Sequence, residues 1–200
     1  MDIYEGGPFE TNSYFLPTAE GGILIDAAEG VCDWLLSKGA RVSTLLITHG
    51  HFDHTLDAAR VQKQFGCRVV YHPDGKRMLT EPGFFRSFGI QVEPIMPGLE
   101  QDEALSVTFD GVEFQVLHVP GHCPGSLCFY LKEEKKLFTG DVLFAGAIGR
   151  WDLPGGNRDQ LITGIIEKLL PLGDEVSVYP GHGPATTIGR ERTTNPFLVG

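Results

Sequence analysis

The chain has 200 residues and a formal net charge of −10, with a sequence pI near 5.1. Hydrophobic residues make up 42% of the chain and charged residues 21%, a balance that is typical of a soluble globular protein and excludes extended disorder. The acidic charge argues against a nucleic-acid partner, because a phosphate backbone would be repelled, and no apolar run is long enough to span a membrane.

The first half of the chain alternates short strands with helices. Val31, Trp34 and Leu35 recur on one face of a predicted helix that ends near Gly39. A continuously apolar run at residues 42–47 is typical of a strand buried on both faces. In chain order, the predicted elements are strands at 13–16 and 22–26, a helix at 30–38, a strand at 42–47, a helix at 56–65 and a strand at 68–71.

The second half opens with residues 80–98, which are rich in proline and glycine. Phe84, Phe85 and Phe88 in this segment are expected to pack onto the core as irregular structure, and a lid over a pocket is the alternative. Asp110-Gly111 then marks a hairpin turn. The predicted elements that follow are strands at 106–109, 112–119, 127–131 and 136–138, a helix at 157–170 and a strand at 176–179.

The order of these elements predicts an α/β fold in which two sheets pack face to face with helices outside. We predict one domain over residues 1–200, with no signal peptide at its start. The four cysteines show no CxxC spacing, so we expect free thiols and a cytoplasmic location. These cysteines are Cys32, Cys67, Cys123 and Cys128.

One short segment concentrates the side chains that bind metals. His49, His51 and Asp53 occupy alternate positions directly after a buried strand, so an extended backbone would send them to the same side. His54 follows where a helix is expected to begin. Imidazole nitrogens and carboxylate oxygens are the donors that zinc, iron and manganese take, and burying them without a partner would be costly. The segment therefore predicts a metal site.

Residues of the same kind recur after later strands. His122 follows one predicted strand, Asp141 another and His182 the last, each beside glycine. Glycine permits the tight turns and close backbone approach that such a site needs. Loops at strand ends are where a layered α/β protein gathers its chemistry, so we expect these side chains to join the first cluster.

Together these motifs resemble the metallo-β-lactamase superfamily, and more narrowly its glyoxalase II-like hydrolases. The resemblance covers essentially the whole chain. It is carried by His49-Gly50-His51-Phe52-Asp53-His54, Pro120-Gly121-His122-Cys123-Pro124-Gly125-Ser126, Gly140-Asp141-Val142-Leu143-Phe144, Gly149-Arg150-Trp151-Asp152-Leu153-Pro154-Gly155-Gly156, Pro180-Gly181-His182-Gly183-Pro184 and Asn195-Pro196-Phe197-Leu198. Cys123 and Trp151 depart from the family pattern.

The resemblance implies a four-layer αββα sandwich with two divalent metal ions at one edge, zinc first and iron or manganese as alternatives. It places one metal on His49, His51 and His122, the other on Asp53, His54 and His182, and Asp141 between them. Asp53 and Asp141 would also act in catalysis, Asp53 by orienting a metal-bridging hydroxide. The chain would be a short form without the C-terminal helical domain of glyoxalase II.

The function that the resemblance implies is hydrolysis of a small-molecule thioester of the 2-hydroxyacyl glutathione type. The alternatives are a persulfide dioxygenase with a single iron, and a lactonase, β-lactamase or other metallo-hydrolase of the same fold. The sequence does not predict an oligomeric state.

Some residues near these motifs have plainer expected roles. We expect His72 and His118 to lie in the core or to support the site rather than to bind its metals. Asp26, after an early strand, is expected to stabilise a turn. Arg150 and Asp152 are expected to form an ion pair in their loop.

Overall fold

The computed structural model describes residues 1–199, with side chains at all of them except Phe84, Ser87 and Phe88. Expectations for the side chains of Phe84 and Phe88 therefore lie outside the described residues.

The first sheet has six strands in the order of the sequence, β1-β2-β3-β4-β5-β6. Its first three strands pair antiparallel, and the pairs from β3 to β6 are parallel. The strands are β1 (Asp2–Gly6), β2 (Thr11–Thr18), β3 (Gly21–Ile25), β4 (Thr44–Leu46), β5 (Arg68–Tyr71) and β6 (Leu99–Glu100).

The second sheet also has six strands, in the order β14-β13-β10-β9-β8-β7, with a parallel pair only at β10 and β13. Its strands are β7 (Ala104–Phe109), β8 (Val112–His118), β9 (Leu127–Leu131), β10 (Lys136–Gly140), β13 (Ser177–Pro180) and β14 (Thr186–Thr187). A two-stranded ribbon, β11 (Leu143–Phe144) and β12 (Ala147–Ile148), follows β10.

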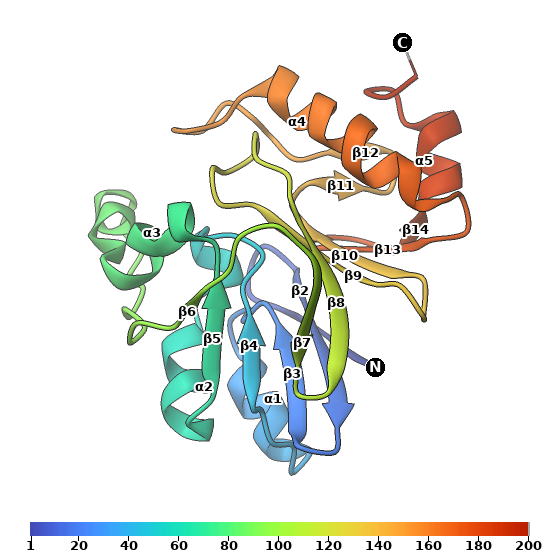
Figure 1. Ribbon diagram of the computed structural model, residues 1–200. Helices are drawn as coiled ribbons and strands as arrows, with labels where there is room; N and C mark the ends of the chain where they lie inside the picture. Colours follow the sequence, from blue (N-terminus) through green and yellow to red (C-terminus); the bar gives the residue numbers. More distant parts are fainter. Residues whose placement is uncertain (200) are drawn as a thin grey trace.

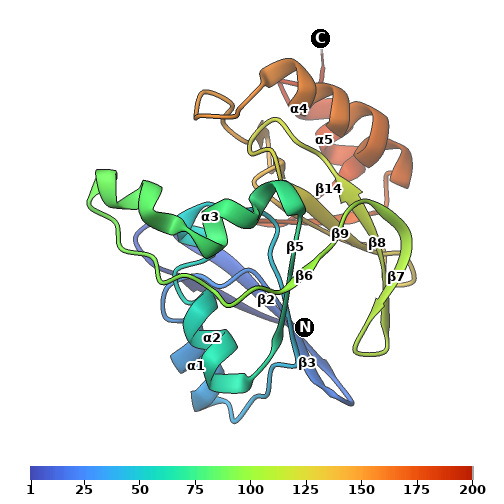
Figure 2. The same cartoon turned by 60° about the vertical axis from the view of Figure 1, so that its left-hand side comes forward.

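Helices cover the outer faces of both sheets (Figures 1 and 2). The α-helices are α1 (Val31–Ser37), α2 (Ala58–Phe65), α3 (Lys76–Thr80), α4 (Arg158–Gly164) and α5 (Ile188–Thr194). The other helical segments are the 3₁₀ segments Phe52–His54, Pro73–Gly75, Pro82–Phe88 and Leu170–Leu172, and a π segment at Ile165–Leu169. In residues 1–199, no helix combines the length and apolar character that a membrane span requires.

Alternation along β3 shows how the layers are held together. Leu24 packs outward with α1 and α2, whereas Ile23 and Ile25 point inward to the second sheet, because successive side chains of a strand face opposite ways. A third apolar cluster joins α4 to the outer face of the second sheet, around Leu161. The layers are thus helices, sheet, sheet and helices, which confirms the predicted αββα sandwich.

Elements with a strong sequence pattern are confirmed, whereas several short elements with a weak pattern were not predicted. The hairpin across Asp110-Gly111 and the strand at 68–71 are present. The helix predicted at 157–170 is helical but divides into α, π and 3₁₀ turns. Part of 80–98 forms a 3₁₀ turn. The single domain over residues 1–200 stays a prediction.

The layer between the sheets should dominate stability. Phe129 on β9 is fully buried there, whereas Leu105 on β7 is 87% exposed. Phe129→Ala should lower the free energy of unfolding by about 3–5 kcal/mol, since it leaves a cavity, while Leu105→Ala should change it by less than about 0.5 kcal/mol. Urea unfolding followed by circular dichroism measures both. Equal losses in the two variants would contradict this account of the core.

Candidate metal centre

All seven predicted ligands lie together at one edge of the sandwich, on segments that directly follow strands. Four of them belong to the segment after β4, which leaves the sheet and turns through a 3₁₀ segment, Phe52–His54. His122 follows β8, Asp141 follows β10 and His182 follows β13. Rigid strands of both sheets therefore position the cluster.

Three histidines form the first donor set. Nε2 of His122 lies 3.2 Å from Nε2 of His49 and 2.8 Å from Nδ1 of His51. The three rings meet edge to face, so their nitrogens converge while their carbon edges pack against one another. Three imidazole nitrogens this close together could hold one metal ion.

The second donor set consists of Asp53, His54 and His182. Oδ2 of Asp53 lies 3.2 Å from Nε2 of His182 and 3.5 Å from Nε2 of His54. Those two ring nitrogens are 3.3 Å apart. The alternation predicted for positions 49, 51 and 53 ends at His51, because the 3₁₀ turn brings Asp53 and His54 to the same set.

Asp141 lies between the two sets. Its Oδ2 is 3.6 Å from Nε2 of His122, and its Oδ1 is 3.2 Å from Nε2 of His54 and 3.5 Å from Nε2 of His182. Among the described residues, Oδ1 of Asp141 is the one buried side-chain nitrogen or oxygen without a hydrogen-bond partner. A buried carboxylate oxygen that lacks a partner needs a cation, so the residues fit two metal ions that share Asp141.

In four of the predicted histidine ligands, the ring nitrogen that faces away from the donor set has a hydrogen-bond partner. Nδ1 of His54 lies 2.8 Å from the Asp26 carboxylate, and Nδ1 of His49 lies 3.1 Å from Oγ1 of Thr48. Backbone carbonyls accept from the others, Arg150 from His122 at 2.7 Å and Phe9 from His182 at 2.9 Å. Such contacts fix Nδ1 as the protonated nitrogen and leave the Nε2 lone pair for a metal.

Asp26 organises the first part of the centre. Its Oδ1 accepts the backbone N–H of Thr48 at 2.8 Å, and its Oδ2 accepts the Thr48 hydroxyl at 2.7 Å in addition to His54. The side chain is buried. The turn role expected for Asp26 was incomplete, because this carboxylate orients a predicted ligand directly.

Asn12 and a glycine fix the loop that carries His182. Asn12 donates from Nδ2 to the carbonyls of Pro180 and Gly183 at 3.1 and 2.9 Å. A Cβ at Gly181 would lie within 2.5 Å of Cε1 of His54 and closer still to Oδ1 of Asp141. Only glycine leaves room for these groups at that position.

The pKa values of the histidines differ between the two donor sets. Burial lowers the pKa of His49 well below its usual value, and burial with His122 lowers the pKa of His51 to about 4. Burial opposes protonation of His182 too, but Asp141 and Asp53 raise its pKa to about 10. Burial also opposes ionisation of Asp141, yet His54 and His182 hold its pKa well below the usual range. A metal in the second set would replace protons as the counter-charge.

The other predictions near the centre have mixed outcomes. Arg150 and Asp152 form a two-pronged ion pair, at 2.8 and 2.9 Å, as expected. The sequence did not reveal the roles of Thr48 and of the Phe9 carbonyl. For Thr48, the only signal in the sequence was its position beside a predicted ligand. A backbone carbonyl such as that of Phe9 gives no signal in the sequence.

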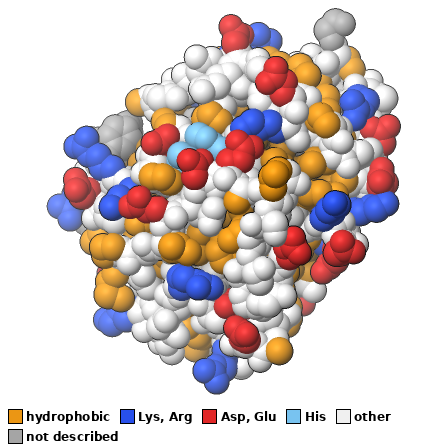
Figure 3. Space-filling view, in the orientation of Figure 1, with side chains coloured by type: hydrophobic (Ala, Val, Ile, Leu, Met, Phe, Trp, Pro, Cys, Tyr) orange, Lys and Arg blue, Asp and Glu red, His pale blue; other side chains and the backbone are white. Residues whose placement is uncertain are grey.

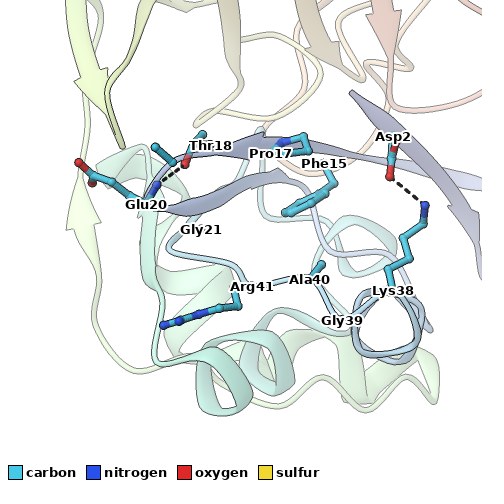
Figure 4. A pocket seen from close by; sticks show the side chains of 11 residues that line it. Asp2, Phe15, Pro17, Thr18, Glu20, Gly21, Lys38, Gly39, Ala40 and Arg41 are labelled. Carbon is cyan, nitrogen blue, oxygen red and sulfur yellow. Dashed lines mark hydrogen bonds and ion pairs between the residues drawn. The ribbon is translucent and has the colours of Figure 1, made fainter.

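A separate hollow of about 600 Å³ lies between the β2–β3 turn and residues 38–41 (Figure 4). Phe15 lies at its side, and the Asp2–Lys38 ion pair crosses one end. None of the seven predicted ligands is among its lining residues. The hollow therefore belongs to a different part of the surface.

Removing the charge of Asp26 should weaken metal binding without unfolding the protein. Asp26→Asn should lower metal affinity about 10- to 100-fold, because His54 loses the carboxylate that orients it. Competition with a chelator measures the affinity. Asp57→Asn is the matched control, since Asp57 is also buried but, among the described residues, accepts only from the backbone N–H groups of Gly30 and Cys32. Equal affinities in wild type and Asp26→Asn would refute this role.

Comparison with known proteins agrees with the geometry. The sequence pattern of the Metallo-beta-lactamase superfamily matches residues 6–182. The chain is 36% identical to a probable metallo-hydrolase of Bacillus subtilis, YqgX, over 97% of this chain and 95% of that protein. It is 41% identical to the hydroxyacylglutathione hydrolase GloC of Haemophilus influenzae, over 78% of this chain and 76% of that protein.

Three solved structures share the fold. BLEG-1, a B3 metallo-β-lactamase, superposes with a TM-score of 0.92 at 36% identity, covering 100% of this chain and 99% of that one. TTHA1623 in a di-iron-bound form gives 0.89 at 36% identity, covering 99% and 100%. ETHE1 from Myxococcus xanthus gives 0.82 at 25% identity, covering 98% and 82%. The chain belongs to the metallo-β-lactamase superfamily and is a metallo-hydrolase of that fold.

Proposed function

We propose that the chain is a thioesterase with two metal ions, which cleaves thioesters of the 2-hydroxyacyl glutathione type. The observation that carries this proposal is the place of Asp141, whose two carboxylate oxygens face different donor sets. A single carboxylate shared in this way is the arrangement that a two-metal hydrolytic site needs. The di-iron form of TTHA1623 supports a pair of metals.

The proposed ligands are the seven donors described above. His49, His51 and His122 would hold one ion, and Asp53, His54 and His182 the other. The set contains nitrogen and oxygen donors without sulfur, which zinc, iron and manganese accept. Zinc is the first candidate and iron the second.

Charge favours a carbonyl-bearing substrate at this centre. Two divalent ions would bring roughly four positive charges against roughly two negative charges from Asp53 and Asp141. Bound there, they would supply a water whose pKa falls toward about 7 and an electrophile for the thioester carbonyl. Asp53 accepts a hydrogen bond from Thr11 at 3.2 Å. As a ligand of the second ion, Asp53 would orient the attacking water.

The leaving group fits the same site. A thiolate departs without being protonated first, so the reaction needs no separate general acid. The similarity to GloC supports a glutathione thioester as the substrate. A small-molecule partner and a cytoplasmic location stay predictions.

Two other reactions have specific support. Similarity to BLEG-1 favours β-lactam hydrolysis, and similarity to ETHE1 favours persulfide oxidation with one iron. The complete second donor set favours hydrolysis over the single-iron reaction. The same panel of substrates separates all three.

The first test is hydrolysis of S-lactoylglutathione by metal-loaded protein. We expect release of free thiol that stops when a chelator removes the metals and resumes when they are restored. Parallel samples receive a β-lactam, or glutathione persulfide with an oxygen electrode. Turnover of either of these, without thiol release from the thioester, would refute the proposal.

The shared carboxylate should be needed for both metals and activity. Asp141→Asn should lower the metal content below about two ions per chain and reduce kcat/KM at least about 100-fold. His182→Ala should leave about one ion, because only the second set loses a ligand. Metal analysis after dialysis, beside the thiol assay, measures both. Two retained ions with full activity in Asp141→Asn would refute the bridging role.

A further inference from the structure

A second group of metal-type side chains lies apart from the seven donors. His72 directly follows β5 of the first sheet, and His118 ends β8 of the second. Their rings stack with centroids 3.9 Å apart and planes 19° from parallel. Asp74 completes the group, which has one ligand atom from each residue within 4.8 Å of the others. The two sheets thus bring these histidines together independently of the candidate metal centre.

The Nε2 atoms of both rings have acceptors. Nε2 of His72 lies 3.3 Å from the carboxylate of Asp102, and Nε2 of His118 lies 2.7 Å from the carbonyl oxygen of Pro124. A neutral imidazole that donates from Nε2 carries its lone pair on Nδ1. Carboxylate and carbonyl acceptors behind the rings are what orient histidines that bind metals. The Asp74 carboxylate lies 3.7 Å from Nδ1 of His72.

Burial and exposure suit an ion that enters from solvent. His72 is only 5% exposed, and burial, then the neighbouring His118, lower its pKa, which favours the neutral ring that can bind an ion. The side chains of Asp74 and Asp102 are 59% and 74% exposed. On the face shown in Figure 3, histidine atoms reach the surface with acidic side chains and a basic side chain around them.

We propose that His72, His118 and Asp74 form a further binding site for a divalent ion of the zinc class. Two imidazoles and one carboxylate are donors that zinc accepts, with water completing the coordination. Nδ1 of His72 now accepts the backbone N–H of Asp74 at 3.1 Å. When the ion binds, it replaces this N–H as the partner of Nδ1. This role differs from the supporting one expected from the sequence.

The site would link the two sheets. His118 also holds the loop of His122 through Pro124, and a Cβ at Gly125 in that loop would lie 2.7 Å from the backbone nitrogen of Gly75. An ion that ties His72 to His118 therefore stiffens the contact between these two loops. The proposal does not depend on which reaction the candidate metal centre catalyses.

Equilibrium dialysis with zinc alone tests the site. Protein that already holds its full complement at the candidate metal centre should take up one additional zinc per chain. His118→Gln and Asp74→Asn should each lose this equivalent, while His182→Ala should keep it. Glu103→Gln is the matched control, because Glu103 is an acid of the same surface that pairs with Lys168 instead.

Thermal unfolding supplies a second readout. With the candidate metal centre already loaded, added zinc should raise the Tm of the wild type and of Glu103→Gln, because a ligand that binds only the native state stabilises it. It should not raise the Tm of His118→Gln. Asp74 is exposed, so Asp74→Asn is expected to fold and keeps the test open if the substitution of the half-buried His118 does not. Equal zinc uptake by wild type, His118→Gln and Asp74→Asn would overturn the proposal.

Discussion

The Asp26 carboxylate is the contact on which the candidate metal centre depends. It lies just after β3 and receives the backbone and hydroxyl of Thr48, which follows β4, together with Nδ1 of His54. One buried carboxylate thereby sets where the ligand-bearing segment leaves the first sheet and how one of its imidazoles is turned. A charged acceptor holds its donors more strongly than a neutral one, so this contact can fix both geometry and tautomer.

The rest of the cluster presents an electrostatic problem that the protein alone does not solve. Ring nitrogens approach to about 3 Å, as between His49 and His122, and the far sides of these two rings are already engaged by protein acceptors. Lone pairs that face one another in a buried space repel, and protonating them all would bury several like charges. A cation in each set would remove the conflict, so metal binding and folding should be coupled here.

Sequence reasoning reached what local patterns encode. The spacing of His49, His51 and His54 after an apolar run identified the main segment, and hairpin chemistry at Asp110-Gly111 placed β7 beside β8. It failed where the information is not local. Strands of two residues, such as β11 and β12, have no periodicity to detect, and the pairing of Asp26 with His54 depends on which strands lie side by side. The seven donors themselves came from the family resemblance as much as from spacing.

The division of donors between the sheets has a consequence for how the site forms. The first sheet supplies His49, His51, Asp53 and His54 from one continuous segment, whereas His122, Asp141 and His182 follow three different strands of the second. Each donor set contains residues from both sheets, so neither set is complete until the sheets pack. His72 and His118 repeat that arrangement on a smaller scale. The candidate metal ligands thus lie where the two sheets meet. The free energy of binding an ion there would stabilise the packing of one sheet against the other.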